Sequence, residues 1–450
     1  MKILCHVGPW CVQQYLQMAY EIDPNAKIVL ISPFLKLDQT GMVQEYYKNL
    51  KSQFDPNIER GFDQDDFIIR CRLLRSMSRN EALLHLHSMK EAVSKALDRE
   101  NPNLVISEAI DQYPMDLLSY ECKQRSIPFF GLTKTFVDGY FRITSRGEKG
   151  KKREVSKLEV SEVMKRLENF NYAPNWDELS ASTSAKRYVV ISKRVVANWA
   201  RIPYFFLKRK LFNEPYNYHY WASQISSMEN FHIFPKFWLG NKEWKKTARK
   251  TNKIKIYHPL QMYPESTIDY WCKCLDDIAY EDKLVNIINS MSEKFHFLIK
   301  EHPGVIGGRG VKLYKLLSQL ENVTLAPTEA NSNELIDESD AVLVWTGSVG
   351  FEAALRGKPV LTVCSPYYAS GGKFKKINEH TKEVEILKHI SNNSPELNYK
   401  DKFDLVEDLL SGFRLGTYIN NSSWSKLNLE HIEQASNIAK EINKELSEAR

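Results

Sequence analysis

The sequence lacks the features that mark several classes of protein. No segment holds the ~18 uncharged apolar residues of a membrane span, and the apolar run at the start is interrupted too early for a signal peptide. The seven cysteines are an odd number without a paired CxxC spacing, so neither a disulfide framework nor a zinc ribbon is readable. We therefore expect a soluble protein of the reducing cytoplasm, either free or peripheral to the cytoplasmic membrane.

Motifs of several common enzyme classes are missing as well. The sequence has no GxGxxG, no GKS or GKT loop, no HExxH and no GxSxG. Nicotinamide dehydrogenases, P-loop NTPases, HExxH zinc proteases and typical α/β-hydrolases are therefore not expected. A paired metal site is not expected either, because His85 and His87 lie two positions apart in a helical pattern and so point to different faces.

The composition is that of an ordinary globular protein. Of the 450 residues, 43% are apolar and 26% are charged, which is enough for a large core divided between two domains. Lys and Arg (62) exceed Asp and Glu (56), giving a net charge of +6. This excess is too diffuse to indicate a nucleic-acid-binding protein, but it favours acidic ligands and anionic membrane surfaces.

Short β-rich runs alternate with helical patterns in two parts of the chain, which predicts an α/β fold with parallel sheets covered by helices on both faces. The expected strands are 2–7, 27–32, 104–107 and 128–132, then 253–257, 295–300, 323–326, 341–345 and 359–363. The helical patterns include 80–99, 114–125, 267–290, 311–320, 333–338, 348–356 and 429–446. A mixed stretch separates the two series, so we place the domain boundary between 235 and 252. The expected parts are an N-terminal domain at 1–240 with a basic and aromatic insertion, a C-terminal domain at 250–425 and a C-terminal helix at 426–450.

The most specific run of residues is the turn Thr346-Gly347-Ser348 between an expected strand and an expected helix. Free backbone amides and two hydroxyls at a helix start predict a phosphate site. In the alternative interpretation, Ser348 only caps the helix and Gly357 ends it. Glu352 lies one turn further along, where it either binds sugar hydroxyls or serves as a second cap or surface charge.

Two His-Pro pairs end neighbouring expected strands. Glu301-His302-Pro303 follows 295–300, and His258-Pro259-Leu260-Gln261, with Pro264-Glu265 after it, follows 253–257. A histidine before proline is often structural, but two such pairs together with the Thr-Gly-Ser turn favour a shared ligand edge, because the carboxyl ends of parallel strands meet.

Candidate catalytic carboxylates lie in the first domain. Glu108 and Asp111 follow the expected strand 104–107, and Asp138 follows the strand at 128–132. In one interpretation these residues are ordinary acidic residues at a helix start or in a loop. In the other they act as a base or a nucleophile in group transfer.

An aromatic and basic segment spans 199–221 and includes Arg201, Lys208, Arg209 and Lys210. It either packs into a core, stacks on sugars or rests on a membrane interface.

Taken in order, the His-Pro, Glu-His-Pro and Thr-Gly-Ser motifs, with Asn333-Glu334-Leu335-Ile336 between the last two, resemble the capsule polysaccharide biosynthesis glycosyltransferases, a group that includes β-Kdo transferases. The resemblance covers about 253–365 well and 104–143 loosely. It implies a GT-B fold, with two Rossmann-like domains facing a cleft and the nucleotide-sugar donor in the C-terminal domain. The family's motifs are also similar to those of bacterial sialyl- and polysialyltransferases. These sialyltransferases have an acidic pair before a glycine as their general base, and Val137-Asp138-Gly139 keeps only one carboxylate, which argues against sialyl transfer. The expected donor-site residues are His258, Gln261, Glu265, Lys300, His302, Pro303, Thr346, Gly347, Ser348 and Glu352.

The resulting expectation is a glycosyltransferase without a metal and without a cofactor other than its nucleotide-sugar substrate. A CMP-ulosonic acid such as CMP-Kdo is the preferred donor and a UDP-sugar the next, with Lys300, Arg309 and Lys358 neutralising the departing phosphate. The expected acceptor is a surface polysaccharide or a lipid-linked glycan, and the expected partners include the inner membrane or other capsule enzymes but no nucleic acid. Two alternatives remain: a CDP-polyol phosphotransferase of the teichoic-acid type, and a non-catalytic GT-B-like glycan-binding protein.

Overall fold

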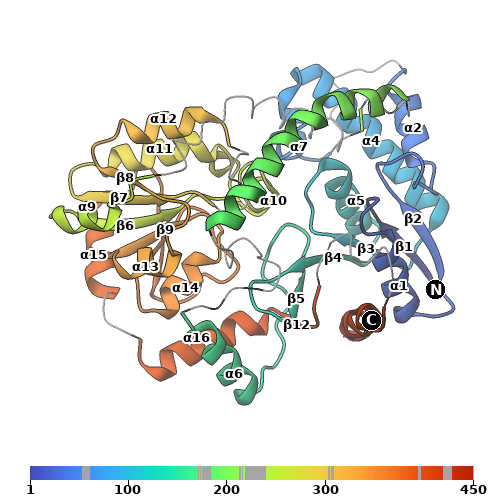
Figure 1. Cartoon of the computed structure of the whole chain (residues 1–450). Helices are drawn as coiled ribbons and strands as arrows, with labels where there is room; N and C mark the ends of the chain where they lie inside the picture. The colour runs from blue at the N-terminus through green and yellow to red at the C-terminus, as the bar shows by residue number, and fades with distance from the viewer. Residues whose placement is uncertain are drawn as a thin grey trace. The chain divides into compact units, whose positions relative to one another are not determined.

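The computed structural model divides the chain into two compact units that are not consecutive in sequence (Figure 1). Unit 1 comprises Met1–Arg153, Phe206–Ala222 and Gly412–Arg450, and unit 2 comprises Glu154–Phe205 and Ser223–Ser411. This division differs from the consecutive domains expected from the sequence, because the chain leaves unit 1 after Arg153 and returns to it twice, at Phe206 and at Gly412. The structure describes residues 1–52, 61–170, 172, 174, 184–211, 214, 216–217, 240–302, 305, 309–393, 397–418 and 428–448.

Unit 1 contains a six-stranded sheet with the order β12-β5-β4-β3-β1-β2. The first four strands in sequence pair in parallel, as expected, while β5 and β12 extend the sheet in antiparallel pairing. The strands are β1 (Lys2–His6), β2 (Lys27–Ile31), β3 (Leu104–Glu108), β4 (Phe129–Lys134), β5 (Tyr140–Ile143) and β12 (Arg414–Leu415). The helices are α1 (Val12–Ile22), α2 (Met42–Asn49), α3 (Gln64–Arg70), α4 (Arg79–Glu100), α5 (Tyr113–Gln124) and α17 (Leu429–Glu448), with a 3-10 turn η1 (Leu74–Ser76).

Helices cover both faces of this sheet. Along β1, Leu4 joins the core formed with α2, α4 and α5, whereas Ile3 and Cys5 join the core formed with α1 and α17. This split follows from the alternation of side chains along a strand. The C-terminal helix α17 contributes Ile438 and Ile442 to the second core and so belongs to the body of unit 1.

Unit 2 contains a six-stranded parallel sheet with the order β11-β10-β9-β6-β7-β8. Counted along the chain, this is the 3-2-1-4-5-6 order of a Rossmann sheet. The strands are β6 (Ile254–Pro259), β7 (Phe295–Lys300), β8 (Val323–Ala326), β9 (Ala341–Val344), β10 (Val360–Thr362) and β11 (Phe374–Lys376). The helices are α6 (Lys157–Leu167), α9 (Trp244–Lys250), α10 (Ser266–Asp269), α11 (Tyr280–Ser290), α12 (Val311–Ser318), α13 (Ser332–Asp337), α14 (Val349–Leu355), α15 (Glu383–Asn393) and α16 (Tyr399–Ser411), with a 3-10 turn η4 (Leu275–Ile278); α7 (Ser184–Leu211) continues from unit 2 into unit 1.

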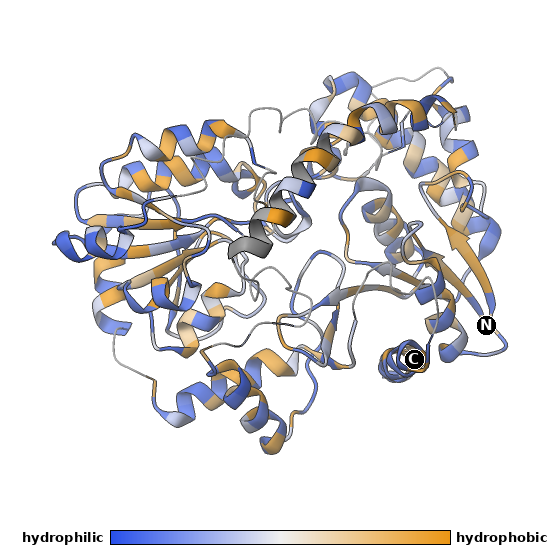
Figure 2. Ribbon diagram, viewed as in Figure 1, coloured by the Kyte–Doolittle hydropathy of each residue, from blue (hydrophilic) through white to orange (hydrophobic). Residues whose placement is uncertain are grey.

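The central strands of both sheets are apolar, as Figure 2 shows by their colour. In β7 and β9 every residue is buried, the pattern of a parallel strand covered on both faces. The α/β class and the two sheets predicted from the sequence are therefore confirmed. Within the part of the chain that the structure describes, no helix is long and apolar enough to cross a membrane.

One expected helix is wrong. The pattern at 267–290 is divided into α10, η4 and α11. Tertiary contacts override the helical periodicity at the break: Cys272 is bonded to Cys364, and Asp277 pairs with Lys283 at 2.8 Å.

Candidate functional site

The candidate site of unit 2 lies where the strand order reverses, between β6 and β9. In an open parallel sheet this is the point at which loops diverge and a ligand has room to bind. Gln261 follows β6, and Thr346, Gly347 and Ser348 follow β9. Four of the predicted site residues thus follow the two strands that flank this topological switch point, which we call the crossing point.

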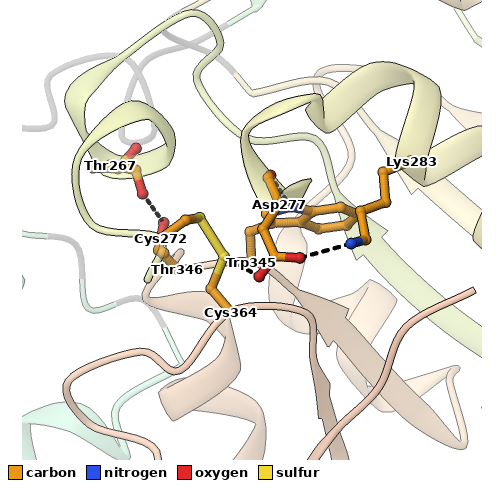
Figure 3. Close-up of a disulfide and its surroundings, with 7 residues drawn as sticks. All are labelled: Thr267, Cys272, Asp277, Lys283, Trp345, Thr346 and Cys364. Carbon is orange, nitrogen blue, oxygen red and sulfur yellow. Dashed lines mark hydrogen bonds and ion pairs between the residues drawn. A yellow bond between two sulfur atoms is a disulfide. The ribbon is translucent and has the colours of Figure 1, made fainter. Parts of the chain in front are cut away.

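The turn after β9 is held from two sides. The Thr346 hydroxyl donates to the backbone oxygen of Thr267 at 3.0 Å, which ties the turn to α10 (Figure 3). The Tyr368 hydroxyl donates to the backbone oxygen of Gly347. A Cβ atom at Gly347 would lie 3.0 Å from both amide atoms of Gln261. Glycine at this position therefore leaves room for the Gln261 side chain beside the turn.

Ser348 and Glu352 form one polar pair. Ser348 precedes α14, but its side chain caps no backbone N–H, so the interpretation of Ser348 as a simple N-cap is wrong. Its hydroxyl instead donates to Oε1 of Glu352 at 3.1 Å, and both residues are half-buried. Contact between either residue and a ligand remains a prediction.

Lys300 supplies a buried positive charge at the carboxyl end of β7. Its Nζ donates to the Ser332 hydroxyl at 2.9 Å, and the same hydroxyl lies 3.3 Å from the Tyr257 hydroxyl. Glu265 lies just before α10, where its Oε2 accepts a hydrogen bond of 2.5 Å from Thr267. Both predicted residues therefore lie at the carboxyl edge.

His258 is part of the core. Its Nδ1 lies 2.8 Å from the backbone oxygen of Leu343 in β9, and its Nε2 lies 3.0 Å from the Tyr280 hydroxyl. Burial lowers the pKa of His258 to about 4, so the ring is neutral at neutral pH. Because both ring nitrogens have protein partners, we assign His258 the role of joining β6 to β9 rather than that of touching a ligand.

The Glu301-His302 motif holds an arginine in place. Arg309 Nε donates to Glu301 at 2.8 Å, its Nη1 donates to Glu281 at 2.9 Å, and its Nη2 donates to the backbone oxygen of Gln261. Its charge is thus used inside the protein, and the expected role of neutralising phosphate does not fit Arg309. His302, which follows Glu301, is half-buried; Pro303 lies outside the described residues.

Lys358 also does not fit its expected role. It precedes β10, at the amino ends of the strands, whereas the candidate site lies at their carboxyl ends. Its Nζ donates to the backbone oxygens of Asp337 at 3.1 Å and Ser339 at 2.7 Å.

The structure contains a disulfide that the cysteine spacing did not reveal. Cys272 and Cys364 are 92 residues apart in sequence, but their Cα atoms are 5.4 Å apart (Figure 3). One follows α10 and the other follows β10, so folding brings them to the same edge of the sheet. The cysteine spacing, from which no disulfide framework is readable, therefore did not predict this pair.

In unit 1, Glu108 is the best placed of the three predicted carboxylates. It ends β3, beside β1, where the strand order of this sheet reverses. Its Oε1 accepts a hydrogen bond of 3.2 Å from Trp10 Nε1. Asp111 is paired with Arg72, and Asp138 lies in the loop between β4 and β5.

The same edge holds two polar residues that we did not predict. Both ring nitrogens of His6 and the hydroxyl of Ser107 are buried without a hydrogen-bond partner among the described residues. The register that pairs Cys5 with Ile106 places His6 beside Ser107. Most buried polar groups have partners, so this pair is unusual. The signal in the sequence was a histidine at the end of an apolar strand.

A known protein family matches part of this chain. Residues 177–384 match the family described as "Capsule polysaccharide biosynthesis protein". Over these residues, a little under half of the chain, the sequence is similar to that family. The match contains every predicted donor-site residue, from His258 to Glu352.

Among curated proteins, the chain resembles the "Capsule polysaccharide modification protein LipA" of Neisseria meningitidis serogroup B, with 36% identity over 74 residues. This alignment covers 16% of the present chain and only 10% of LipA.

Among solved structures, it aligns with "Thermosulfurimonas dismutans KpsC, beta Kdo 2,7 transferase" at a TM-score of 0.36 and 12% identity, covering 97% of this chain and 99% of that one. It aligns with UDP-GlcNAc 2-epimerase from N. meningitidis at a TM-score of 0.31 and 14% identity, covering 100% of both chains. Similarity this low carries no argument about activity.

Proposed function

We propose that this protein is a glycosyltransferase of capsule polysaccharide synthesis that transfers a sugar from a nucleotide-sugar donor to a growing glycan or a lipid-linked acceptor. The observation that carries the proposal is that the family match of 177–384 contains a polar site at the crossing point of a Rossmann-ordered sheet. The preferred donor is a CMP-ulosonic acid such as CMP-Kdo. The proposed architecture is GT-B, with the donor bound by unit 2 and the acceptor by unit 1.

The geometry supports a role for the turn after β9 in binding the donor phosphate. Thr346 is fixed to α10, and Gly347 lets the turn approach Gln261 closely, so the backbone at Gly347 and Ser348 is held in one position. Groups held in advance lose little entropy when the ligand binds. Lys300 provides a positive charge at the same edge.

In this proposal the reaction needs no metal ion. Lys300 and the backbone N–H groups of the turn would then stabilise the negative charge of the leaving nucleotide. In unit 1, Glu108 would act on the acceptor hydroxyl or on the reacting sugar carbon.

Nucleotide binding is the first test. Thermal unfolding should be followed with CMP, CDP, UDP and GDP, because a ligand that binds only the folded state raises the unfolding midpoint. We expect the cytidine nucleotides to give the largest increase. No increase with any of the four would contradict a nucleotide-sugar donor.

Product analysis is the second test. The protein is incubated with CMP-Kdo and a purified capsule-type acceptor, with and without EDTA, and the product mass is measured. A mass increase of one sugar residue that is insensitive to EDTA supports the proposal. Transfer of phosphoglycerol from CDP-glycerol would instead identify a CDP-polyol phosphotransferase, and nucleotide binding without any transfer would identify a glycan-binding protein.

A further inference from the structure

Helix α7 concentrates the positive charge of the protein. Its 28 residues contain eight Lys or Arg and no Asp or Glu. Without these eight cations, the net charge of +6 for the whole chain would become −2. A charge that seemed diffuse in the composition is therefore carried by one helix.

The same helix exposes large apolar side chains. Val196 is 69% exposed, Trp199 56% and Leu211 77%, and Tyr204, Phe206 and Leu207 are also exposed. In Figure 2, apolar and polar colours alternate along α7. Contiguous exposed apolar surface on a soluble protein usually marks an interaction site.

The exposed residues are arranged by the helical repeat. Val189, Val196, Leu207 and Leu211 are separated by 7, 11 and 4 residues, which are close to whole numbers of turns, so they form one apolar stripe. Arg201 and Lys208 are seven residues apart and form a second, basic stripe beside it. Phe205, which is buried, lies on the side opposite the apolar stripe.

We propose that α7 is an interfacial helix that binds the surface of an anionic phospholipid bilayer. In this arrangement Trp199, Phe206 and Leu207 enter the boundary between headgroups and acyl chains, while exposed cations such as Lys193 and Arg201 bind lipid phosphates. The helix lies in the plane of the surface and does not span the bilayer. The inference does not depend on the proposed enzymatic activity.

An anionic bilayer fits these observations better than an acidic glycan or a nucleic acid. A soluble polyanion would satisfy the cations but would leave the stripe of Val, Leu and aromatic side chains in water. On α7 a cation and an exposed apolar side chain lie next to each other, because Lys210 Nζ is 4.8 Å from the centre of the exposed Phe206 ring. The bilayer surface is the one of these partners that accepts both kinds of group.

The test is sedimentation of the full chain with vesicles of phosphatidylcholine, with and without phosphatidylglycerol. The charge variant is Lys193→Gln/Arg201→Gln/Lys210→Gln, and the apolar variant is Trp199→Ala/Phe206→Ala/Leu207→Ala. The matched control, Lys315→Gln/Lys382→Gln/Lys388→Gln, removes three exposed lysines elsewhere. Circular dichroism and the unfolding midpoint verify that each variant is folded.

We expect the wild type and the control to bind phosphatidylglycerol vesicles, with the charge and apolar variants each at least about tenfold weaker. Added salt should weaken binding by the wild type. An apolar variant that binds like the wild type would overturn the proposal, because charge alone would then explain the binding. An equal loss in the control and charge variants would overturn it as well, since the effect would belong to net charge and not to α7.

Discussion

The carboxyl edges of the two sheets differ in how their polar side chains are satisfied. In unit 2, His258 is bonded through both ring nitrogens, and Arg309 is bonded to Glu301, Glu281 and Gln261. In unit 1, His6 and Ser107 have no hydrogen-bond partner among the described residues. A side chain bonded through all of its polar atoms is held in one geometry, whereas buried groups such as His6 and Ser107 keep hydrogen-bonding capacity for something that is not part of the chain.

The largest effect is expected when the hydrogen bonds and ion pairs of Arg309 in unit 2 are removed. In the variant Arg309→Met, Glu301 stays buried without a cationic partner, and we expect the stability of unit 2 to fall by about 3 to 5 kcal/mol. Chemical denaturation followed by circular dichroism measures this change.

Arg249→Met provides the control for that prediction. Arg249 is paired with Glu338 on the surface, and loss of an exposed ion pair changes the stability of a protein little. If the free energy of unfolding falls by the same small amount in both variants, the hydrogen bonds of Arg309 do not stabilise the carboxyl edge of unit 2.

The α/β class and the position of the ligand edge could be predicted from the sequence, because strand periodicity and the order of elements determine which loops meet. The partners of individual charged side chains could not be predicted from the sequence. Arg309 looked available for phosphate until folding placed Glu301 and Glu281 around it. Lys358 is a different case: it precedes the expected strand 359–363, so its position at the amino edge was readable from topology alone.

Contacts between distant segments explain the other differences. The Cys272–Cys364 disulfide and the break in the helix at 267–290 depend on segments that meet only in the folded chain. The buried pair of His6 and Ser107 likewise requires the register between β1 and β3.

The next largest effect is expected at the edge of unit 1. Glu108 lies at the crossing point of the strands, whereas Asp111 is paired with Arg72. We expect Glu108→Gln to lower glycosyl transfer at least about a hundredfold, the lower range for general acid–base help, while nucleotide binding stays unchanged. Initial rates with a purified acceptor and calorimetric titration with CMP measure the two quantities.

Asp111→Asn is the comparison variant, and its transfer rate should change much less. Near wild-type rates in Glu108→Gln would remove Glu108 from the reaction and move attention to Asp138.

A smaller effect is expected for single hydrogen bonds to the donor. We expect His302→Ala and Ser348→Ala each to weaken CMP binding by about 1 to 3 kcal/mol, the range for a hydrogen bond to a charged group. Lys358→Gln, at the opposite edge, should leave the affinity unchanged. Unchanged affinity in both alanine variants, measured by calorimetry, would rule out the proposed phosphate site.

The smallest effect is the pH dependence of stability, and it compares the two edges directly. Burial lowers the pKa of His6 and of His258 to about 4, below the usual 6.5. The unfolded chain therefore takes up a proton first as the pH falls, so this stability is fully present above about pH 6.5 and declines towards pH 4. His6→Leu and His258→Leu should each reduce the loss of the unfolding midpoint between pH 7 and pH 5.

The two variants should differ at pH 7. His258→Leu leaves the Leu343 carbonyl and the Tyr280 hydroxyl without this partner and should lower the midpoint, because an unsatisfied buried group costs about 1 to 3 kcal/mol. His6→Leu removes a group whose nitrogens have no partner among the described residues, so its midpoint should be equal to or above that of the wild type. Hydrogen exchange of peptides containing β1 and β6 assigns each change to its own unit. A midpoint that falls equally in both variants would show that His6 is bonded as fully as His258, and the contrast between the two edges would then be lost.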